Sequence, residues 1–391
     1  MEIRDDTIGV YVHIPYCISK CPYCNFSSAA ISSPPEKRYS DCVIKELSFY
    51  LETEGLNGRR LETVYIGGGT PSIFSPEEIG RVISSIKGRF IPLGNDIEVT
   101  LEVNPDTVDL KKLAAYARGG VTRLSIGAQS FSDVELESIG RTHSARRALD
   151  AFHEAREAGS RNIGVDLIFG LPGQREKDWE SSVRKAIGLR PEHISVYGLT
   201  IEEGTPFFSA FKGRAGLPSE EAEAAMYERA IYLLQEAGYI HYEISNFALP
   251  GKTSVHNSRY WADKDYLGLG ASAHSYISRP GWGRRWWNAP DPREYMRAIE
   301  NAGTARVGEE KLRREEAMTE AMMLGLRRLD KGIEGRAFKE RFGSLPKESF
   351  KRWEALHKDG LLNGPNDDIV LTPKGVLLSN EVFLKMAEGC L

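Results

Sequence analysis

Short apolar runs alternate with longer helical patterns over roughly the first half of the chain. The run Ile8–Ile14 is almost continuously apolar, which is typical of a strand buried on both faces. The stretch that follows Ser75 opens with Pro76 and two acids, a good helix start. We predict strands at 8–14, 63–66, 97–103, 122–127, 162–168 and 193–198, and helices at 37–52, 75–87, 109–118, 145–158 and 177–188. This alternation predicts an α/β fold with a parallel sheet, either an incomplete barrel of six β/α units or a doubly wound open sheet.

Polar residues interrupt this pattern near the end of each predicted strand. Because active sites collect at the carboxyl ends of parallel strands, we expect these residues to meet on one rim. In chain order they are the cysteines after the first strand, Gly67–Thr70 after the second, Glu102 and Asn104 on the third, Gln129 on the fourth, Asp166 on the fifth and Tyr197 on the sixth.

Cys17, Cys21 and Cys24 lie on one short loop after the first strand. Three thiolates can hold three irons of a 4Fe–4S cluster and leave the fourth iron open for a substrate. A structural zinc site is the main alternative and needs a fourth ligand, for which His13 and Cys42 are the candidates. The loop by itself favours the cluster, and the polar rim strengthens that interpretation.

Composition limits the classes of protein that fit. The formal charge of −4 and the pI of about 6.1 give no overall attraction to nucleic acid or to an anionic membrane. We find no run near the roughly 18 apolar residues of a membrane span and no leader pattern at the start. Five cysteines, three of them clustered, do not suggest a disulfide framework, so we expect a reducing, cytoplasmic location.

Several motifs together resemble one family. The C-x3-C-x2-C spacing is similar to the radical S-adenosylmethionine (SAM) superfamily, in which the open iron binds SAM and reduction releases a 5′-deoxyadenosyl radical. The branch that contains oxygen-independent coproporphyrinogen III oxidase and the HemW heme chaperones matches over nearly the whole length. The matching motifs are Tyr-Val-His-Ile-Pro-Tyr-Cys, Gly-Gly-Gly-Thr-Pro-Ser, Glu-Val-Asn-Pro, Ile-Gly-Ala-Gln-Ser-Phe, Gly-Arg-Thr-His and Asp-Leu-Ile-Phe-Gly-Leu-Pro-Gly.

This resemblance implies an incomplete (β/α)6 radical SAM barrel and assigns roles on its rim. Cys17, Cys21 and Cys24 would ligate the cluster, and Glu102 would bind the SAM ribose. The other SAM-binding positions would be Tyr11 beside the adenosyl group, Gly68, Gly69 and Thr70 at the methionine moiety, and Gln129, Arg141 and Asp166 completing the pocket.

Two departures from the oxidase pattern favour the HemW side of the branch. The oxidase has a further cysteine two residues after the third, where this chain has Phe26, and a longer arm before the first cysteine. The resemblance therefore implies a heme chaperone that delivers heme to heme proteins. A radical SAM enzyme acting on a porphyrin, by decarboxylation or methyl transfer, stays an alternative, so enzymatic activity is left undecided.

A heme site is predicted beyond the barrel. His256-Asn-Ser-Arg-Tyr-Trp261 matches the motif that is associated with heme binding in HemW, and neutral imidazole suits heme iron. His274 is a second, less favoured candidate, and Arg284 and Arg285 are candidates for the propionates. The alternative for His256 is a packing role under the barrel mouth.

The last part of the chain changes to helices at 315–329, 337–342 and 347–358, followed by a small β-wing around a turn at 364–368. This resembles a winged-helix module. Its charges are mixed, so we expect packing or docking rather than nucleic-acid binding. We divide the chain into a core barrel at 1–240, an aromatic-rich connecting region with the heme site at 241–310, and a winged-helix-like domain at 311–391. The family also leaves open a homodimer and acceptor heme proteins at a membrane.

Overall fold

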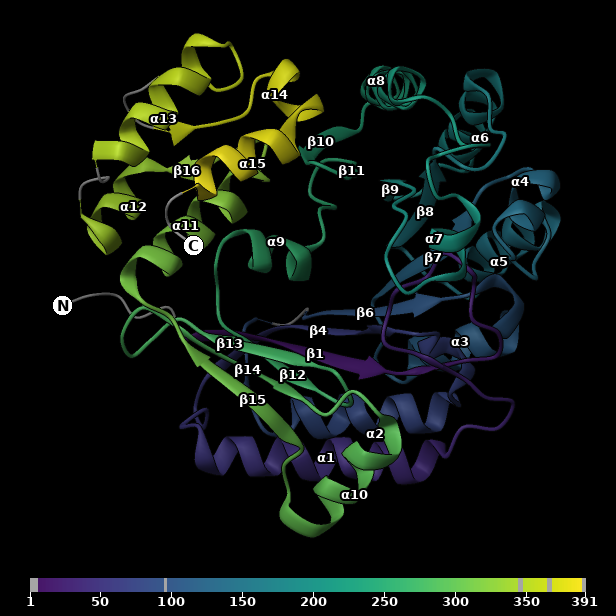
Figure 1. Cartoon of the computed structure of the whole chain (residues 1–391). Helices are drawn as coiled ribbons and strands as arrows, with labels where there is room; N and C mark the ends of the chain where they lie inside the picture. The colour runs from purple at the N-terminus through teal and green to yellow at the C-terminus, as the bar shows by residue number, and fades with distance from the viewer. Residues whose placement is uncertain (1–5, 95–96, 344–346, 364–367, 389–391) are drawn as a thin grey trace.

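Six parallel strands form the centre of one curved sheet, as the alternation predicted (Figure 1). The computed structural model describes residues 6–94, 97–343, 347–363 and 368–388. Residues 1–5, on which part of the leader argument rested, and residues 364–367 of the predicted wing turn lie outside them. The six strands are β1 (Thr7–Ile14), β4 (Arg60–Gly68), β6 (Glu98–Val103), β7 (Arg123–Gln129), β8 (Ile163–Phe169) and β9 (His193–Gly198).

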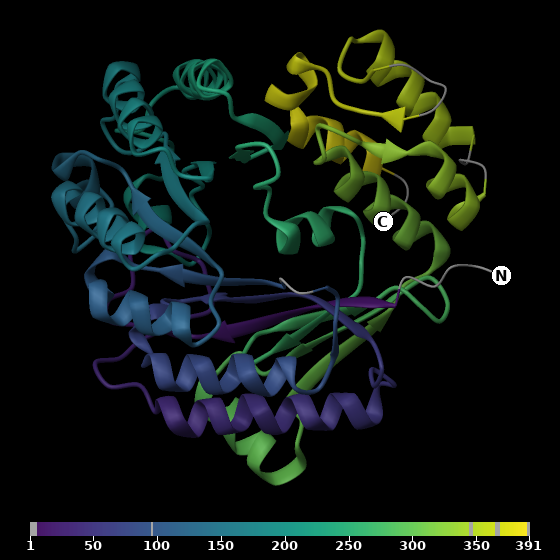
Figure 2. The ribbon, with the colours of Figure 1, turned by 180° about the vertical axis from the view of Figure 1, so that it is seen from behind.

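Helices cover the outer face of these strands (Figures 1 and 2). Helix α2 shows why they form. The Ser75 side chain accepts a hydrogen bond from the amide of Glu78, Pro76 occupies the first turn, and four apolar side chains at helical spacing are buried. Each such side chain contributes roughly 1.5–3 kcal/mol to folding when it is buried. The helices that follow the strands are α1 (Glu36–Thr53), α2 (Pro76–Lys87), α3 (Leu110–Arg118), α4 (Asp133–Ser138), α5 (Ala145–Glu157), α6 (Glu176–Leu189), α7 (Pro206–Ala210) and α8 (Glu220–Glu236), with 3-10 turns at Pro71–Ile73 and Pro105–Thr107.

The sheet continues beyond the six strands at both edges. At the β9 edge lie two antiparallel strands, β11 (Asn246–Ala248) and β10 (Ile240–Glu243). At the β1 edge the sheet adds a parallel strand and three antiparallel ones, which we call the β1-side extension. Its strands are β12 (Tyr266–Leu269), β13 (His274–Ile277), β14 (Arg284–Asn288) and β15 (Arg306–Lys311).

The described strands therefore form a path with two ends, and the barrel does not close. The predicted connecting region at 241–310 supplies strands to both edges instead of lying between two separate domains. It also contains α9 (Val255–Trp261), which lies over the inner face of the sheet, and α10 (Pro292–Ala302), which lies beside α1 (Figure 1). The domain boundaries themselves stay a prediction.

The carboxyl-terminal part is mainly helical and has an apolar core of its own. This core includes Tyr276 of β13, which ties the helices to the β1-side extension. Two short antiparallel pairings, between β16 and β17 and between Leu362 and Leu371, form the small β element that the sequence predicted. The elements are α11 (Arg314–Leu326), β16 (Ile333–Glu334), α12 (Gly335–Phe342), α13 (Lys347–Lys358), β17 (Asp368–Ile369), α14 (Pro373–Leu377) and α15 (Ser379–Ala387); the remaining short strands are β2 (Tyr16–Cys17), β3 (Ala29–Ala30) and β5 (Ile91–Pro92).

Candidate functional site

The cysteine loop is closed at its base by a two-stranded pairing at the carboxyl end of β1. The amide of Ala29 donates to the carbonyl of Pro15 at 2.8 Å, and the amide of Ile31 donates to that of Cys17 at the same distance. Within the loop, the amide of Cys24 donates to the carbonyl of Cys21 at 3.1 Å. The three thiols are free and lie on one short, internally bonded loop.

The two residues that were candidates for a fourth zinc ligand are His13 and Cys42. Both proposed fourth zinc ligands have other contacts. The His13 nitrogens bond the Tyr11 hydroxyl and the Ser27 carbonyl, each at 2.8 Å, and the Cys42 sulfur lies 3.8 Å from the Met296 carbonyl. Across the described part of the chain, no three His, Cys, Asp or Glu side chains are close enough to hold a single metal ion.

Two polar side chains point at the cysteine sulfurs. The Arg141 guanidinium donates to the sulfur of Cys21 at 3.7 Å, and the Thr70 hydroxyl donates to that of Cys17 at 3.4 Å. Burial raises the pKa of Cys24, and its proximity to the other two cysteines raises it further. Both donors place hydrogens against sulfur atoms that would carry negative charge as metal ligands.

The glycines after β4 are needed for close packing as well as for ligand access. Gly68 has a φ of 116°, and a Cβ there would lie 2.6 Å from the His13 imidazole. A Cβ on Gly69 would lie 2.7 Å from the Tyr16 carbonyl oxygen and 3.0 Å from the Cys17 sulfur. The glycine segment therefore lies directly against the cysteine loop, where the prediction that Gly68, Gly69 and Thr70 contact SAM requires it to be.

Glu102 lies beside this segment inside the barrel. Its carboxylate accepts hydrogen bonds from the Tyr65 hydroxyl at 2.8 Å and from the amide of Gly68 at 3.0 Å. Burial raises the pKa of Glu102 to about 7, although both of these donors favour the charged form. A carboxylate with free lone pairs at this place can accept hydrogen bonds from hydroxyl groups of a ligand.

Gln129, at the end of β7, and Arg141, in the segment between α4 and α5, come together beside Gly127. Gln129 has a φ of 65°, which is unusual for a residue with a side chain, and it lies at an irregularity in the pairing of β7 with β8. Its amide nitrogen would lie 2.9 Å from a Cβ on Gly127, so the side chain folds over that glycine. Arg141 donates to the Gly127 carbonyl at 3.1 Å, which brings its guanidinium to the same place.

Asp166 and Tyr11 face the barrel interior from either side of this group. The Asp166 carboxylate accepts from the Ser125 hydroxyl at 3.0 Å, and burial raises its pKa. The Tyr11 ring centroid is 6.1 Å from that of Tyr65. Sequence reasoning missed Tyr65 and Ser125, although strand alternation places Tyr65 on the same face as Gly67 and Ser125 on the same face as Gly127.

His256 lies deep inside the barrel. It is 1% exposed, and its ring nitrogens contact the Thr63 hydroxyl at 2.8 Å and the Tyr260 hydroxyl at 2.9 Å. Burial lowers its pKa to about 3, so the ring is neutral, but neither nitrogen is free for iron in this arrangement. Its backbone amide donates to Glu98 at 2.9 Å, which fixes the start of α9.

The two arginines considered for heme propionates are also engaged. Arg284 pairs with Glu54 and Glu309, and Arg285 lies 2.7 Å from both Glu310 and Glu320. Their guanidinium groups thus join the strands of the β1-side extension to α1 and α11. The expectation that they are available for propionates does not hold in this structure.

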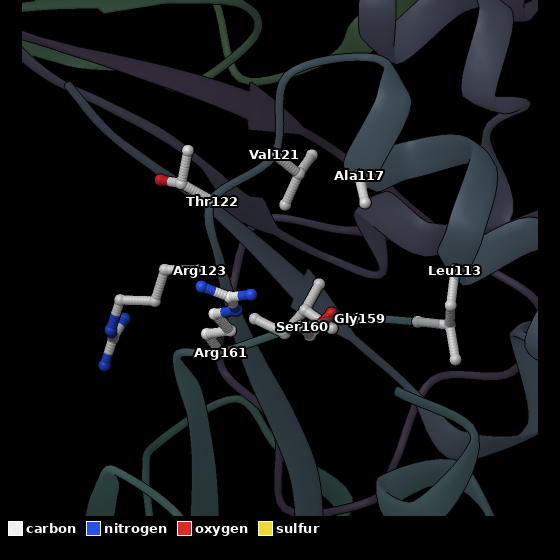
Figure 3. A pocket seen from close by; sticks show the side chains of 9 residues that line it. Leu113, Ala117, Val121, Thr122, Arg123, Gly159, Ser160 and Arg161 are labelled. Carbon is white, nitrogen blue, oxygen red and sulfur yellow. The ribbon is translucent and has the colours of Figure 1, made fainter. Parts of the chain in front are cut away.

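A separate pocket lies at the opposite end of the strands (Figure 3). Val121, Thr122 and Arg123 line it at the start of β7, and Gly159–Arg161 line it just before β8. The predicted site residues instead come from the carboxyl ends of the strands, so this pocket is not part of the candidate site.

Comparisons with known proteins agree with this architecture. The model of the radical SAM superfamily matches residues 11–186, and that of the HemN C-terminal domain matches residues 312–378. The heme chaperone HemW of Bacillus subtilis is 38% identical over 378 residues, which are 96% of this chain and 98% of that protein. The heme chaperone HemW of Escherichia coli is 39% identical over 274 residues, covering 70% of this chain and 71% of its own.

A solved structure shows the same fold. Coproporphyrinogen III oxidase (HemN) of Escherichia coli superposes with a TM-score of 0.83 at 23% identity, covering 97% of this chain and 90% of its own. At that identity the likeness concerns the fold, including the carboxyl-terminal helical part, and says nothing of the substrate.

Proposed function

Because this chain belongs to the HemW family of the radical SAM superfamily, we propose that it is a heme chaperone, which binds heme and delivers it to heme proteins. The observation that carries the proposal is the near-full-length likeness to curated heme chaperones, whose length this chain matches almost completely. The side chains that we assign below to a cluster and to SAM come from neighbouring strands and the loops after them, which supports the proposal.

The cysteine loop would hold a 4Fe–4S cluster through Cys17, Cys21 and Cys24. Such a cluster supplies an open iron for the amino and carboxylate groups of SAM, and an electron. Arg141 and Thr70 donate toward two of the ligand sulfurs and so stabilise their negative charge. Their presence beside the loop supports the ligand assignment.

The rim next to the loop would bind SAM. The backbone of Gly68 and Gly69 leaves room for the methionine moiety, and Glu102 would accept from the ribose hydroxyls. Four further residues would complete the pocket: Tyr11, Gln129, Arg141 and Asp166. Their convergence from β1, β7, β8 and the segment after β7 supports this assignment.

We also propose a cytoplasmic location, with acceptor heme proteins as partners. The proposal rests on the cysteine usage, in which Cys17, Cys21 and Cys24 are clustered on one loop and would serve as metal ligands, which a reducing compartment favours. Within the described residues, no helix is long and apolar enough to cross a membrane. Arginines of the carboxyl-terminal part pair with carboxylates, as in Arg336 with Glu340, which argues against a basic nucleic-acid surface.

The experiment that tests the proposal is an anaerobic heme titration of the cluster-reconstituted protein, followed by transfer of the bound heme to an apo heme protein. We expect saturation near one heme per chain and recovery of the acceptor's spectrum. Product analysis with SAM, a reductant and coproporphyrinogen runs in parallel. Conversion at enzymatic rates would favour the alternative of a porphyrin-modifying enzyme, and absence of saturable binding would contradict the chaperone proposal.

A further inference from the structure

His274 differs from His256 in having ring nitrogens that are open to a ligand. It is exposed at the start of β13, and in the described part of the chain neither nitrogen makes a hydrogen bond. Partial burial and the nearby Arg285 lower its pKa, so the imidazole is neutral and keeps a lone pair. Binding iron at His274 breaks no existing hydrogen bond, whereas at His256 it would displace the hydroxyl of Tyr260 or Thr63.

The indole of Trp287 fixes the orientation of the His274 ring. The two rings stack with centroids 5.8 Å apart and planes inclined by 22°. Trp287 in turn lies flat on Gly308, where a Cβ would come within 2.2 Å of the indole. A nitrogen lone pair lies in the plane of its ring, so a partner stacked on the ring face leaves the nitrogen edge open to a metal.

The loop before His274 is held rigidly by a buried polar network. The carboxylate of Glu46 accepts from the Gly270 amide at 2.9 Å, from the Tyr295 hydroxyl at 2.7 Å and from the Asn288 amide at 2.5 Å. Gly270 and Ser272 both have positive φ values, 101° and 60°. Glycine adopts such values freely, but Ser272 in the left-handed region costs free energy and persists only where its surroundings fix it, often at functional sites.

This loop brings His274 to the rim that carries the proposed SAM site. Gly268 pairs with Tyr11 of β1. A Cβ added to Gly268 would lie 2.0 Å from the His274 carbonyl oxygen, so the two backbones are in close contact. Gly270 lies against the carbonyl of His13, and the His13 ring covers Gly68. A ligand on His274 would therefore lie across β1 from the glycine segment that faces the cysteines.

We propose that heme is bound at the β1-side extension with its iron on the imidazole of His274, and that Trp287 is a positioning residue for that ring. This inference rests on the proposed function and names its iron ligand. His256 then has a structural role, joining α9 to β4 through Thr63.

The test is an anaerobic heme titration of the cluster-reconstituted full chain, followed by visible absorption and electron paramagnetic resonance. We expect His274→Ala to weaken heme binding by about tenfold or more and to change the iron spectrum. His274→Cys should bind heme with the spectrum of a thiolate ligand, a change that loss of folding does not produce. His153→Ala, which changes an exposed histidine on α5, is the matched control and should behave as wild type.

The outcomes separate this inference from the proposed function. Absence of saturable heme binding by the wild type overturns both. If the wild type binds heme and both His274→Ala and His274→Cys bind it with the same affinity and spectrum, His274 is not the iron ligand. The proposal that the protein is a heme chaperone is then unaffected. If a folded His256→Ala variant loses the iron spectrum and His274→Ala keeps it, the iron ligand is His256 and the assignment of His274 is wrong.

Discussion

The six parallel strands and the β1-side extension assemble their polar side chains in different ways. In the parallel part, each β/α unit delivers its residues to the same rim, because all carboxyl ends point one way; Glu102 of β6 and Asp166 of β8 are examples. In the extension the antiparallel strands alternate in direction, and His274 reaches the rim only through the turn that Glu46 of α1 holds. A site built from repeated units follows chain order, whereas a site built on hairpins depends on distant partners.

The largest effect is expected from a substitution in the cysteine loop, which should change the parallel part and leave the β1-side extension unchanged. Cys17→Ser should reduce the iron content after anaerobic reconstitution from about four per chain to near zero, because the cluster loses one of three ligands. Heme binding should persist, since the contacts that position His274 do not involve the loop. Iron and acid-labile sulfide are measured, with Cys42→Ser, a buried thiol in α1, as the control. An unchanged iron count in Cys17→Ser would show that the ligand assignment is wrong.

The second prediction concerns the network that holds the extension. Burial raises the pKa of Glu46 to about 7, so between about pH 4.5 and 7 the folded state keeps a proton that the unfolded state has lost. This group therefore makes stability fall as pH rises through that window, by roughly 3 kcal/mol for the shift of about 2.5. Glu46→Gln should remove this dependence and also lower stability, because its amide group would face existing donors.

Thermal unfolding of wild type and Glu46→Gln at pH 5 and pH 8 measures the difference. Iron content should stay the same in both proteins if the two regions are independent. Equal pH dependence in wild type and variant would contradict a neutral Glu46.

The third prediction concerns the parallel part. In the proposed site the ribose hydroxyls of SAM would donate to the charged form of Glu102. Because the pKa of Glu102 is about 7, SAM affinity should weaken as pH falls from 8 to 6. Glu102→Gln should weaken binding by about 10–100-fold and flatten the pH profile, as expected for loss of charge-assisted hydrogen bonds. Calorimetry on reconstituted protein measures the affinity. The control is Glu135→Gln, a buried carboxyl that is bonded to Ser130 and is not among the proposed SAM residues. If the SAM affinity of Glu102→Gln still changes with pH as that of the wild type does, another group causes the pH dependence.

The smallest effect is expected at Gln129. Its positive φ costs about 1 kcal/mol, which Gln129→Gly relieves, so the variant should be slightly more stable in thermal unfolding while it binds SAM less well. Gln129→Ala, which loses the same amide but keeps the strained backbone, is the matched variant. If Gln129→Gly binds SAM as wild type does, the side chain has no part in the pocket.

The local pattern of the chain determined the parallel part of this protein. Each predicted strand there lies within three residues of an observed strand boundary, because near-continuous apolar runs and capped helices carry their own signals. The same pattern gave the order in which Gly68, Glu102, Gln129 and Asp166 reach the rim. The cysteine spacing by itself predicts a cluster, because three thiols close together in the chain share one loop whatever the rest of the fold.

Only the tertiary structure decided the surroundings of the histidines. Sequence spacing favoured His256, but Thr63 and Tyr260 enclose it, and Thr63 lies 193 residues away along the chain. The position of His274 depends on the pairing of its strand with residues 284–288, which pair in turn with 306–311, and on Glu46, which holds the preceding turn. Such pairings join segments whose local patterns do not identify their partners, so the availability of a side chain emerges only when the whole sheet has formed.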